Sequence, residues 1–400
     1  SGPEKNATAT NTVNYWTGWN VRWPHWMPPA LKMRLSPLIF LLLISATAAG
    51  SSLVDSTDGR YGFEARLTYG FLVAHRPNLR PLQERHLRSI EFSLLVPTDG
   101  QRGWQQDFAF PEKGLQLAFF DLGNAERLGL GVALYPFLDF PLAGQGQWKW
   151  RLRYGMGLGY VQRNFDPEVN YKNTAIGSKL NGVIHFDLRV RKRFGRGALE
   201  GGLGITHYSN GATAMPNLGI NLAAAHFGYL QYFGTKSPKH HIQLLRVRSG
   251  FWATAFASAS WKEIYPPLGR KYLAASVSGD LFYVLSNKVD AVLGADLFYD
   301  QSLRVRMEAT EKSPQPGSTN LRPGVHTGLQ VLVGKLGLLF NLGYYPYTRF
   351  QEDGRYFHRI GFRYYFPRLI AVMNLKTHYA RADFVEWGIG WRFRSTSKTP

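Results

Sequence analysis

Most of the chain after residue 60 alternates between apolar and polar residues with a period of two. From Trp148 to Tyr160, aromatic and aliphatic residues at the even positions alternate with lysine, arginine and glycine at the odd positions. Residues 184–191 and 385–394 repeat the pattern. Because successive strand side chains point to opposite faces, each segment is predicted to be a β-strand with one apolar and one polar face.

The number and length of these segments favour a membrane barrel over a soluble sandwich. About sixteen candidate strands lie between Arg60 and Arg394, and fourteen is an equally defensible count. A tilted strand crosses a bilayer in ~9–11 residues, and bacterial barrels alternate short periplasmic turns with longer outer loops, as the connections do here. The sequence therefore predicts an all-β fold: one transmembrane antiparallel β-barrel of about 14–16 strands, with apolar residues facing lipid.

The N-terminal region predicts export. Residues 35–50 carry no charge, follow Lys32 and Arg34, and contain the small-x-small sequence Ala46-Thr47-Ala48. These are the features of a secretory signal peptide, whereas a membrane-anchor helix needs ~20 apolar residues. We expect an unstructured extension over residues 1–32, a signal peptide over residues 33–48, and a single mature barrel over residues 49–400.

Composition narrows the possible functions. The formal charge of +20 would suit nucleic acid, but an exported barrel would not meet that partner. The chain has no cysteine, which excludes a disulfide scaffold, a thiolate zinc site and a cysteine nucleophile. The mean hydropathy of −0.23, with one long apolar run, excludes a polytopic helical membrane protein. The sequence predicts no metal site and no cofactor.

One segment carries residues suited to ester hydrolysis. His207 and Ser209 lie two positions apart and share the face of three aliphatic residues, which is the predicted lipid-facing side, where polar groups are costly. If His207 pairs with Asn221 across a hairpin, the three residues resemble a nucleophile, a base and a group that holds the imidazole tautomer. The amides of Asn210 and Gly211 are candidate oxyanion donors. The alternative is a polar strand end that caps an Asn-Gly turn.

The sequence His207-x-Ser209-Asn210-Gly211 resembles the active-site strand of two families of outer-membrane lipid hydrolases. In the PagL-type lipid A 3-O-deacylase family, also called the acyloxyacyl hydrolase family, His-x-Ser-Asn precedes a Pro/Asn/Gly turn and a glutamate. Here the turn is Pro216-Asn217-Leu218-Gly219, and Asn221 stands at the glutamate position. Outer-membrane phospholipase A has a similar segment with asparagine as the third member. The PagL resemblance covers residues 60–233 and implies an eight-stranded barrel, which leaves the second half unexplained.

These resemblances imply a hydrolase in the outer membrane of a Gram-negative bacterium. Ser209 would cleave an acyl ester of lipid A, so lipopolysaccharide in the outer leaflet is the expected substrate. A phospholipase A-like esterase acting on phospholipid is the alternative. The other alternative is a non-catalytic barrel, such as a porin, a structural protein or an assembly component. It is motivated by the absent glutamate and by a chain about twice the size of a PagL-type barrel.

A second histidine segment, Thr377-His378-Tyr379, repeats the residues of Thr206-His207-Tyr208. A duplicated hairpin or a chance match in strand composition would explain the repeat. His378 shares a face with asparagine and lysine, and Glu386 with arginine. Both residues are therefore expected to face the lumen and to pair structurally, rather than to form a second site.

Overall fold

The structure, a computed structural model, describes residues 60–235, 238–240, 248–267, 269–311, 313–379 and 381–393. The predicted extension and signal peptide lie outside these residues. Within the described part, no helix is long and apolar enough to cross a membrane. In the described residues, four short helices occupy three of the connections: η2 (Pro77–Leu82), α2 (Gly103–Asp107), and, within one connection, α3 (Gln301–Glu311) and η3 (Gly317–Asn320).

The all-β class and the antiparallel pairing are confirmed, and the sixteen described strands lie within the predicted range. The strands are β1 (Tyr61–Leu72), β2 (Leu87–Pro97), β3 (Glu112–Asp121), β4 (Leu130–Gln145), β5 (Trp148–Val161), β6 (Leu180–Phe194), β7 (Gly197–Ser209), β8 (Ile220–Phe233), β9 (Phe251–Glu263), β10 (Lys271–Val284), β11 (Val289–Asp300), β12 (Leu321–Val333), β13 (Leu336–Tyr344), β14 (Tyr356–Tyr365), β15 (Leu369–His378) and β16 (Arg381–Phe393).

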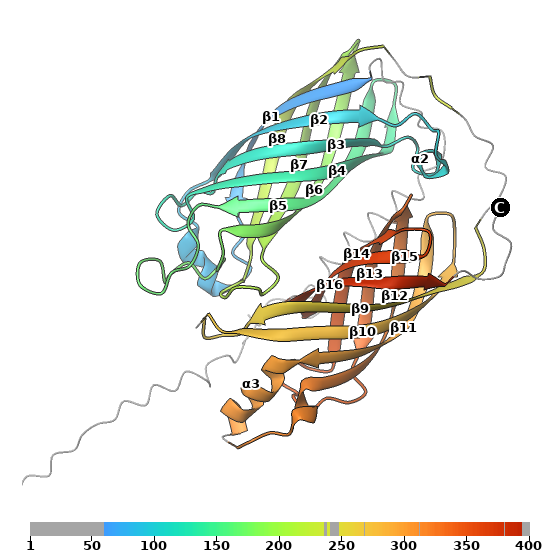
Figure 1. The fold of residues 1–400 in the computed structure, drawn as a ribbon. Coiled ribbons are helices and arrows are strands. Elements are labelled where there is room, and N and C mark those ends of the chain that lie inside the picture. The colour runs from blue at the N-terminus through green and yellow to red at the C-terminus, as the bar shows by residue number, and fades with distance from the viewer. Residues whose placement is uncertain are drawn as a thin grey trace, which may run out of the picture.

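The strands close into two barrels, which corrects the expected single barrel over residues 49–400. β1 pairs with β8 to close the first barrel, and β16 pairs with β9 to close the second (Figure 1). Eight strands enclose a space that side chains can fill. Arg66 on β1 therefore reaches Asp187 on β6 across the lumen, with 2.5 Å between their charged atoms.

Buried ion pairs fill both lumens. Four fully buried arginines of the first barrel, Arg151, Arg153, Arg189 and Arg191, contact carboxylates of Glu64, Glu112, Asp139 and Glu200. In the second barrel, Arg359 lies 2.8 Å from Glu386 and 2.9 Å from Asp296. Glu386 and His378 are buried in the lumen with structural partners, as predicted.

Paired charged side chains occupy the lumen of the first barrel. One small cavity of about 10 Å³ lies beside Arg66 and Glu91, and it has room for about one water molecule. Because the interior is filled by paired side chains, it resembles the packed core of a small barrel rather than the aqueous channel of a porin. This packing argues against the porin alternative.

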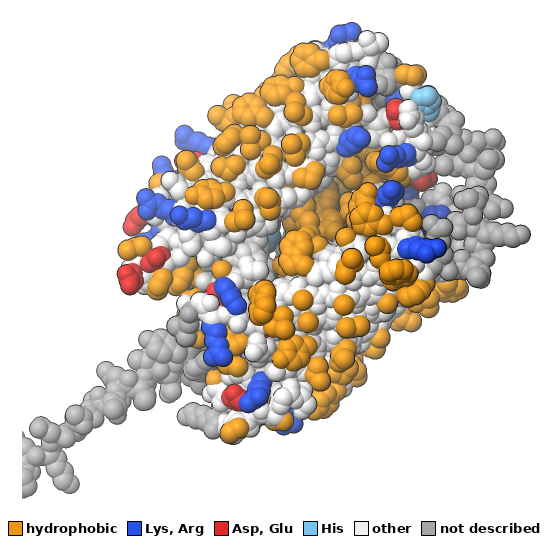
Figure 2. Space-filling view, viewed as in Figure 1, with side chains coloured by type: hydrophobic (Ala, Val, Ile, Leu, Met, Phe, Trp, Pro, Cys, Tyr) orange, Lys and Arg blue, Asp and Glu red, His pale blue; other side chains and the backbone are white. Residues whose placement is uncertain are grey.

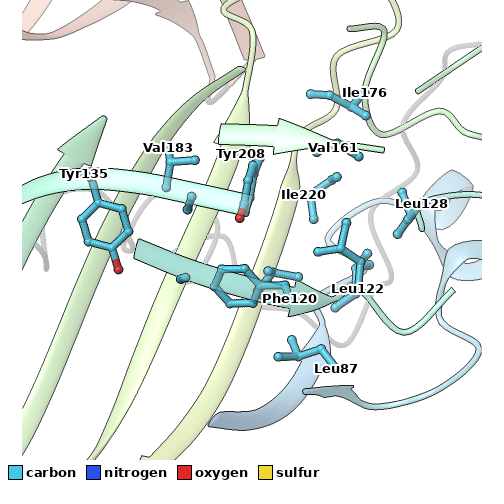
Figure 3. Close-up of a cluster of buried hydrophobic side chains, with 14 of the residues drawn as sticks. Leu87, Phe120, Leu122, Leu128, Tyr135, Val161, Ile176, Val183, Tyr208 and Ile220 are labelled. Carbon is cyan, nitrogen blue, oxygen red and sulfur yellow. The ribbon is translucent and has the colours of Figure 1, made fainter. Parts of the chain in front are cut away.

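The loop end of the first lumen is apolar. Tyr208 on β7 and Ile220 on β8 are fully buried there, packed with Phe120, Val183 and Leu122 (Figure 3). Because alternate residues of a strand face opposite sides, burial of Tyr208 turns its neighbours on β7 outward. Burial of Ile220 does the same for the next residue of β8. This packing therefore orients the candidate site.

On the side of the molecule shown in Figure 2, hydrophobic side chains cover much of the outward surface of both barrels, while lysine and arginine gather toward the ends. Leu67 and Leu203 on the first barrel are 65% and 70% exposed, and Ile389 on the second is 65% exposed. Apolar side chains so exposed on a closed barrel are typical of a lipid-facing surface.

The two barrels pack side by side through β4–β6 of the first and β12–β14 of the second. Phe140 and Leu152 belong to one buried cluster with Val331, Val333 and Leu338. Nearby, the rings of Tyr154 and Phe362 stack with their centroids 6.0 Å apart. A further contact lies at the loop end, next to the candidate site.

Candidate active site

His207 and Asn221 are paired across the β7–β8 hairpin, as the sequence analysis supposed. His207 Nδ1 lies 2.6 Å from Asn221 Oδ1. Because an amide oxygen only accepts hydrogen bonds, Nδ1 of His207 carries the proton. The lone pair is then on Nε2, where a general base needs it.

Gly219 allows the His207 ring to occupy this position. Its φ of +82° lies in the left-handed region that glycine adopts without steric cost. A Cβ atom at this position would lie 2.6 Å from His207 Cε1. The last residue of the Pro-Asn-Leu-Gly turn is therefore needed for the geometry of the site as well as for the turn itself.

Ser209 contacts the turn rather than the histidine. Asn217 Nδ2 donates to Ser209 Oγ at 3.0 Å, and the Gly211 amide donates to the same oxygen at 3.2 Å. Within the described ranges, no hydrogen bond joins Ser209 to His207. Catalytic hydrogen bonds often form only when substrate is bound. For Ser209 to give its proton to His207, the serine hydroxyl would have to rotate toward the histidine.

The two predicted oxyanion donors differ in their surroundings. The Gly211 amide is directed at Ser209 Oγ, beside which an ester oxygen would develop charge. The Asn210 amide instead donates to Asn217 Oδ1 at 3.1 Å. This bond holds the Asn217 side chain with its Nδ2 group toward the serine. Asn217 thus supplies a donor that the sequence analysis had assigned only to the turn.

His75 is a second residue that the sequence analysis missed. It lies in the β1–β2 connection, and Asn221 Nδ2 donates to its Nδ1 at 2.8 Å. Burial lowers the pKa of His75 below its ordinary value, so the ring is neutral at pH 7 and Nδ1 can accept. No periodic pattern marks His75, because it lies 146 positions from Asn221 in a loop.

The site opens on the lipid-facing side of the first barrel. His207 and Ser209 are partly exposed, and Leu203 and Ile205 beside them on β7 are exposed. An apolar groove of about 950 Å³ runs over the same outward surface. It is lined by Leu67, Tyr69, Ile90, Phe92, Phe119, Leu130, Ala225 and Phe227, among others. Ala225 is four residues, or about 13 Å, from Asn221 along β8, so the groove and the site share the outward surface without sharing a lining residue.

No metal site accompanies these residues in the part of the chain that the structure describes, where no group of three or more His, Asp or Glu side chains is arranged to hold an ion.

Two family models match the chain, one in each barrel. The model of "Lipid A 3-O-deacylase (PagL)" matches residues 88–230, and that of "Acyloxyacyl hydrolase, C-terminal domain" matches residues 250–395. No curated protein matches the chain. The two family models together match most of the chain.

Solved structures with similarity include the outer membrane enzyme PagL, at 15% identity and a TM-score of 0.29, covering 41% of this chain and 97% of that one. A mutant of Rhodopseudomonas blastica porin aligns at 10% identity and a TM-score of 0.17, covering 83% of this chain and 99% of the porin. At these TM-scores neither structure bears on function.

Proposed function

Because the chain belongs to the PagL family of lipid A deacylases, ester hydrolases of the Gram-negative outer membrane, we propose that Ser209 and His207 remove an acyl chain from lipid A. The observation that carries this proposal is the 2.6 Å contact between His207 Nδ1 and Asn221 Oδ1. It leaves Nε2 of a neutral imidazole available as a base, on the same lipid-facing side as a serine hydroxyl.

In the proposed reaction, the Ser209 hydroxyl gives its proton to His207 Nε2 as its oxygen attacks the ester carbonyl. The Gly211 amide and Asn217 Nδ2 donate to the developing oxyanion. His207 then returns the proton to the departing alkoxide of lipid A, leaving the acyl chain on Ser209. A water molecule, deprotonated by His207, releases the fatty acid and restores the serine.

Asn221 replaces the glutamate of the family pattern. Its amide oxygen holds the His207 tautomer, but it brings no negative charge to stabilise the imidazolium that forms during attack. His75 compensates in part by fixing the orientation of the amide: its Nδ1 accepts from Asn221 Nδ2, so Oδ1 points to His207. We therefore propose His75 as a positioning residue and expect slower turnover than a carboxylate would support.

Two features favour lipid A over phospholipid as the substrate. The site lies at the end of the barrel with the longer loops, which in bacterial barrels is the outer end, and lipopolysaccharide forms the outer leaflet there. The family match is to a deacylase of lipid A. The apolar groove on the same outward surface suits an acyl chain, and either lipid would supply one.

The test uses the refolded full chain and its Ser209→Ala variant with lipopolysaccharide and, separately, with phosphatidylethanolamine. Ser318→Ala, at an exposed serine of the second barrel, is the matched control. Mass spectrometry should find lipid A that lacks one acyl chain, formed by the wild type and the control but not by Ser209→Ala. Cleavage of the phospholipid alone would favour the phospholipase alternative. Absence of both products from a folded protein would overturn the proposed activity.

A further inference from the structure

The loop that carries the candidate oxyanion donor touches the second barrel. The backbone amide of Glu263, the last residue of β9, donates to Ala212 O at 2.8 Å. In return, the Met215 amide donates to Glu263 Oε2 at 3.0 Å. One residue of the second barrel therefore holds two points of the loop over residues 210–216, one through its backbone and one through its side chain.

The Glu263 carboxylate is fixed rather than mobile. The side chain is 5% exposed. The Gly269 amide donates to Oε1 at 2.6 Å, and Lys271 Nζ donates to Oε2 at 3.0 Å. Lys271 Nζ also donates to Thr213 O at 2.5 Å. A buried carboxylate persists only when its partners replace water, and here the partners link the β9–β10 end to the loop of the first barrel.

The second barrel also packs directly on Gly211. A Cβ atom on Gly211 would lie 2.1 Å from Val385 Cγ2 on β16. Gly211 has a φ of +63°, and Ala212, which has a Cβ atom, has a φ of +68°. A non-glycine residue in this region is strained, and such conformations persist where surrounding contacts enforce them. The contacts to the second barrel are of that kind.

From these contacts we infer that the second barrel is a support for catalysis, in which Glu263 positions the loop that aims the Gly211 amide at the oxyanion. An oxyanion donor lowers the barrier only if it is held where charge develops. The inference deepens the proposed function and rests on it. It gives the second half of the chain a role that needs no second active site.

The test compares Glu263→Ala with Glu308→Ala, which removes a carboxylate from α3 of the same barrel without touching the first barrel. Hydrogen exchange of residues 210–218 reads the loop without requiring activity, and it should be faster in Glu263→Ala alone. With lipid A as substrate, kcat should fall about 10- to 100-fold at nearly constant KM, somewhat less than the loss of an oxyanion donor itself. Glu263→Gln, which keeps an acceptor oxygen, should recover part of the rate.

Lys271→Met provides a second variant in case Glu263→Ala fails to fold, because the Lys271 side chain is 42% exposed. Lys271→Met should also make hydrogen exchange of the loop faster and lower kcat, each by less than Glu263→Ala does. Unchanged exchange in both variants would overturn the inference, as would faster exchange with unchanged kcat. If the wild type itself shows no Ser209-dependent hydrolysis, the proposed function fails, and the exchange data alone decide whether the second barrel holds the loop.

Discussion

The seventh strands of the two barrels, β7 and β15, carry the sequence Thr-His-Tyr at their C-terminal ends, where Tyr379 directly follows β15, and the two histidines face opposite sides. His207 points out of the first barrel toward Asn221. His378 is 5% exposed in the second lumen, where its Nε2 lies 3.0 Å from the hydroxyl oxygen of Tyr345. Because strand side chains alternate with a period of two, a one-residue difference in phase exchanges the lipid face for the lumen. His378 keeps the lumen-facing phase of Asn374 and Lys376 on β15. The irregularity between β15 and β16 at Lys376/Thr377 leaves out a residue of β16, Asp383, and does not change this phase.

The difference extends to the next position. Tyr208 is followed by Ser209, whereas Tyr379 is followed by Ala380, which lies outside the described residues. The second barrel therefore has neither an outward histidine nor a serine at this point of the hairpin. The comparison agrees with the proposed division of roles between two similar barrels, with the chemistry on the first and structural support on the second.

Replacing each histidine in turn should give the largest effects and should distinguish the two roles. His207→Ala should lower kcat by about 10²–10⁴-fold, the range expected for the loss of a general base, with little change in thermal stability because its ring is at the outer surface. His378→Ala should leave kcat nearly unchanged and lower the melting temperature, because it removes a buried partner of Tyr345.

Steady-state release of fatty acid and thermal unfolding monitored by circular dichroism measure the two effects. The two variants control for each other, since both remove an imidazole from the end of a seventh strand. Equal losses of activity, with equal losses of stability, would contradict the division of roles.

A glycine substitution should give an intermediate effect. In Gly219→Ala the new Cβ atom would lie 2.6 Å from His207 Cε1 and would occupy a φ of +82°. The His207 ring must then tilt away from Asn221, so we expect kcat to fall about tenfold or more, as small misplacements of reacting groups do. Kinetic assays with lipid A should detect the loss.

Gly279→Ala on β10 is the matched control, because nothing lies within 4 Å of the Cβ atom that it would add. It should keep the wild-type rate. If Gly219→Ala retained full activity as well, the position of His207 seen here would not be the one that catalysis uses.

The local features of the fold were predictable because they follow from neighbouring residues. Alternation identified the strands, the outward face of His207 and Ser209, and the lumen position of Glu386. Barrel closure was not predictable in the same way, since it depends on pairs such as Arg66 with Asp187, which come from opposite walls of the lumen and lie 121 positions apart. The alternation of apolar and polar residues does not indicate which distant residues pair across a lumen.

Some residues of the candidate site could be predicted from neighbouring positions in the sequence, and others could not. Asn221 was found because a hairpin brings it opposite His207 at a spacing of 14 residues. His75 and Glu263 reach the site from other loops, and neither belongs to a motif. Asn217 was visible within the turn, but only its hydrogen bonds to Ser209 and Asn210 distinguish it from an ordinary turn residue.

The smallest expected effect concerns His75 and the dependence of turnover on pH. Burial lowers the pKa of His75, so its neutral form persists at pH 7 and is lost only as pH falls below the ordinary histidine range. Protonation would place a donor against Asn221 Nδ2, and the amide would then no longer present Oδ1 to His207. His75→Leu, which removes one hydrogen bond worth about 1 kcal/mol, should lower kcat about fivefold at pH 7.

The pH profile distinguishes this positioning role from simple packing. With two histidines that must both be neutral, the acid limb of log kcat/KM should approach a slope of about 2, and His75→Gln, which keeps an acceptor, should reduce it to about 1. His358→Gln, at a histidine of the second barrel, should retain the wild-type slope. Because the prediction depends on the Asn221 amide, an acid limb of the same slope in wild type and His75→Gln would show that His75 does not control the orientation of that amide during turnover.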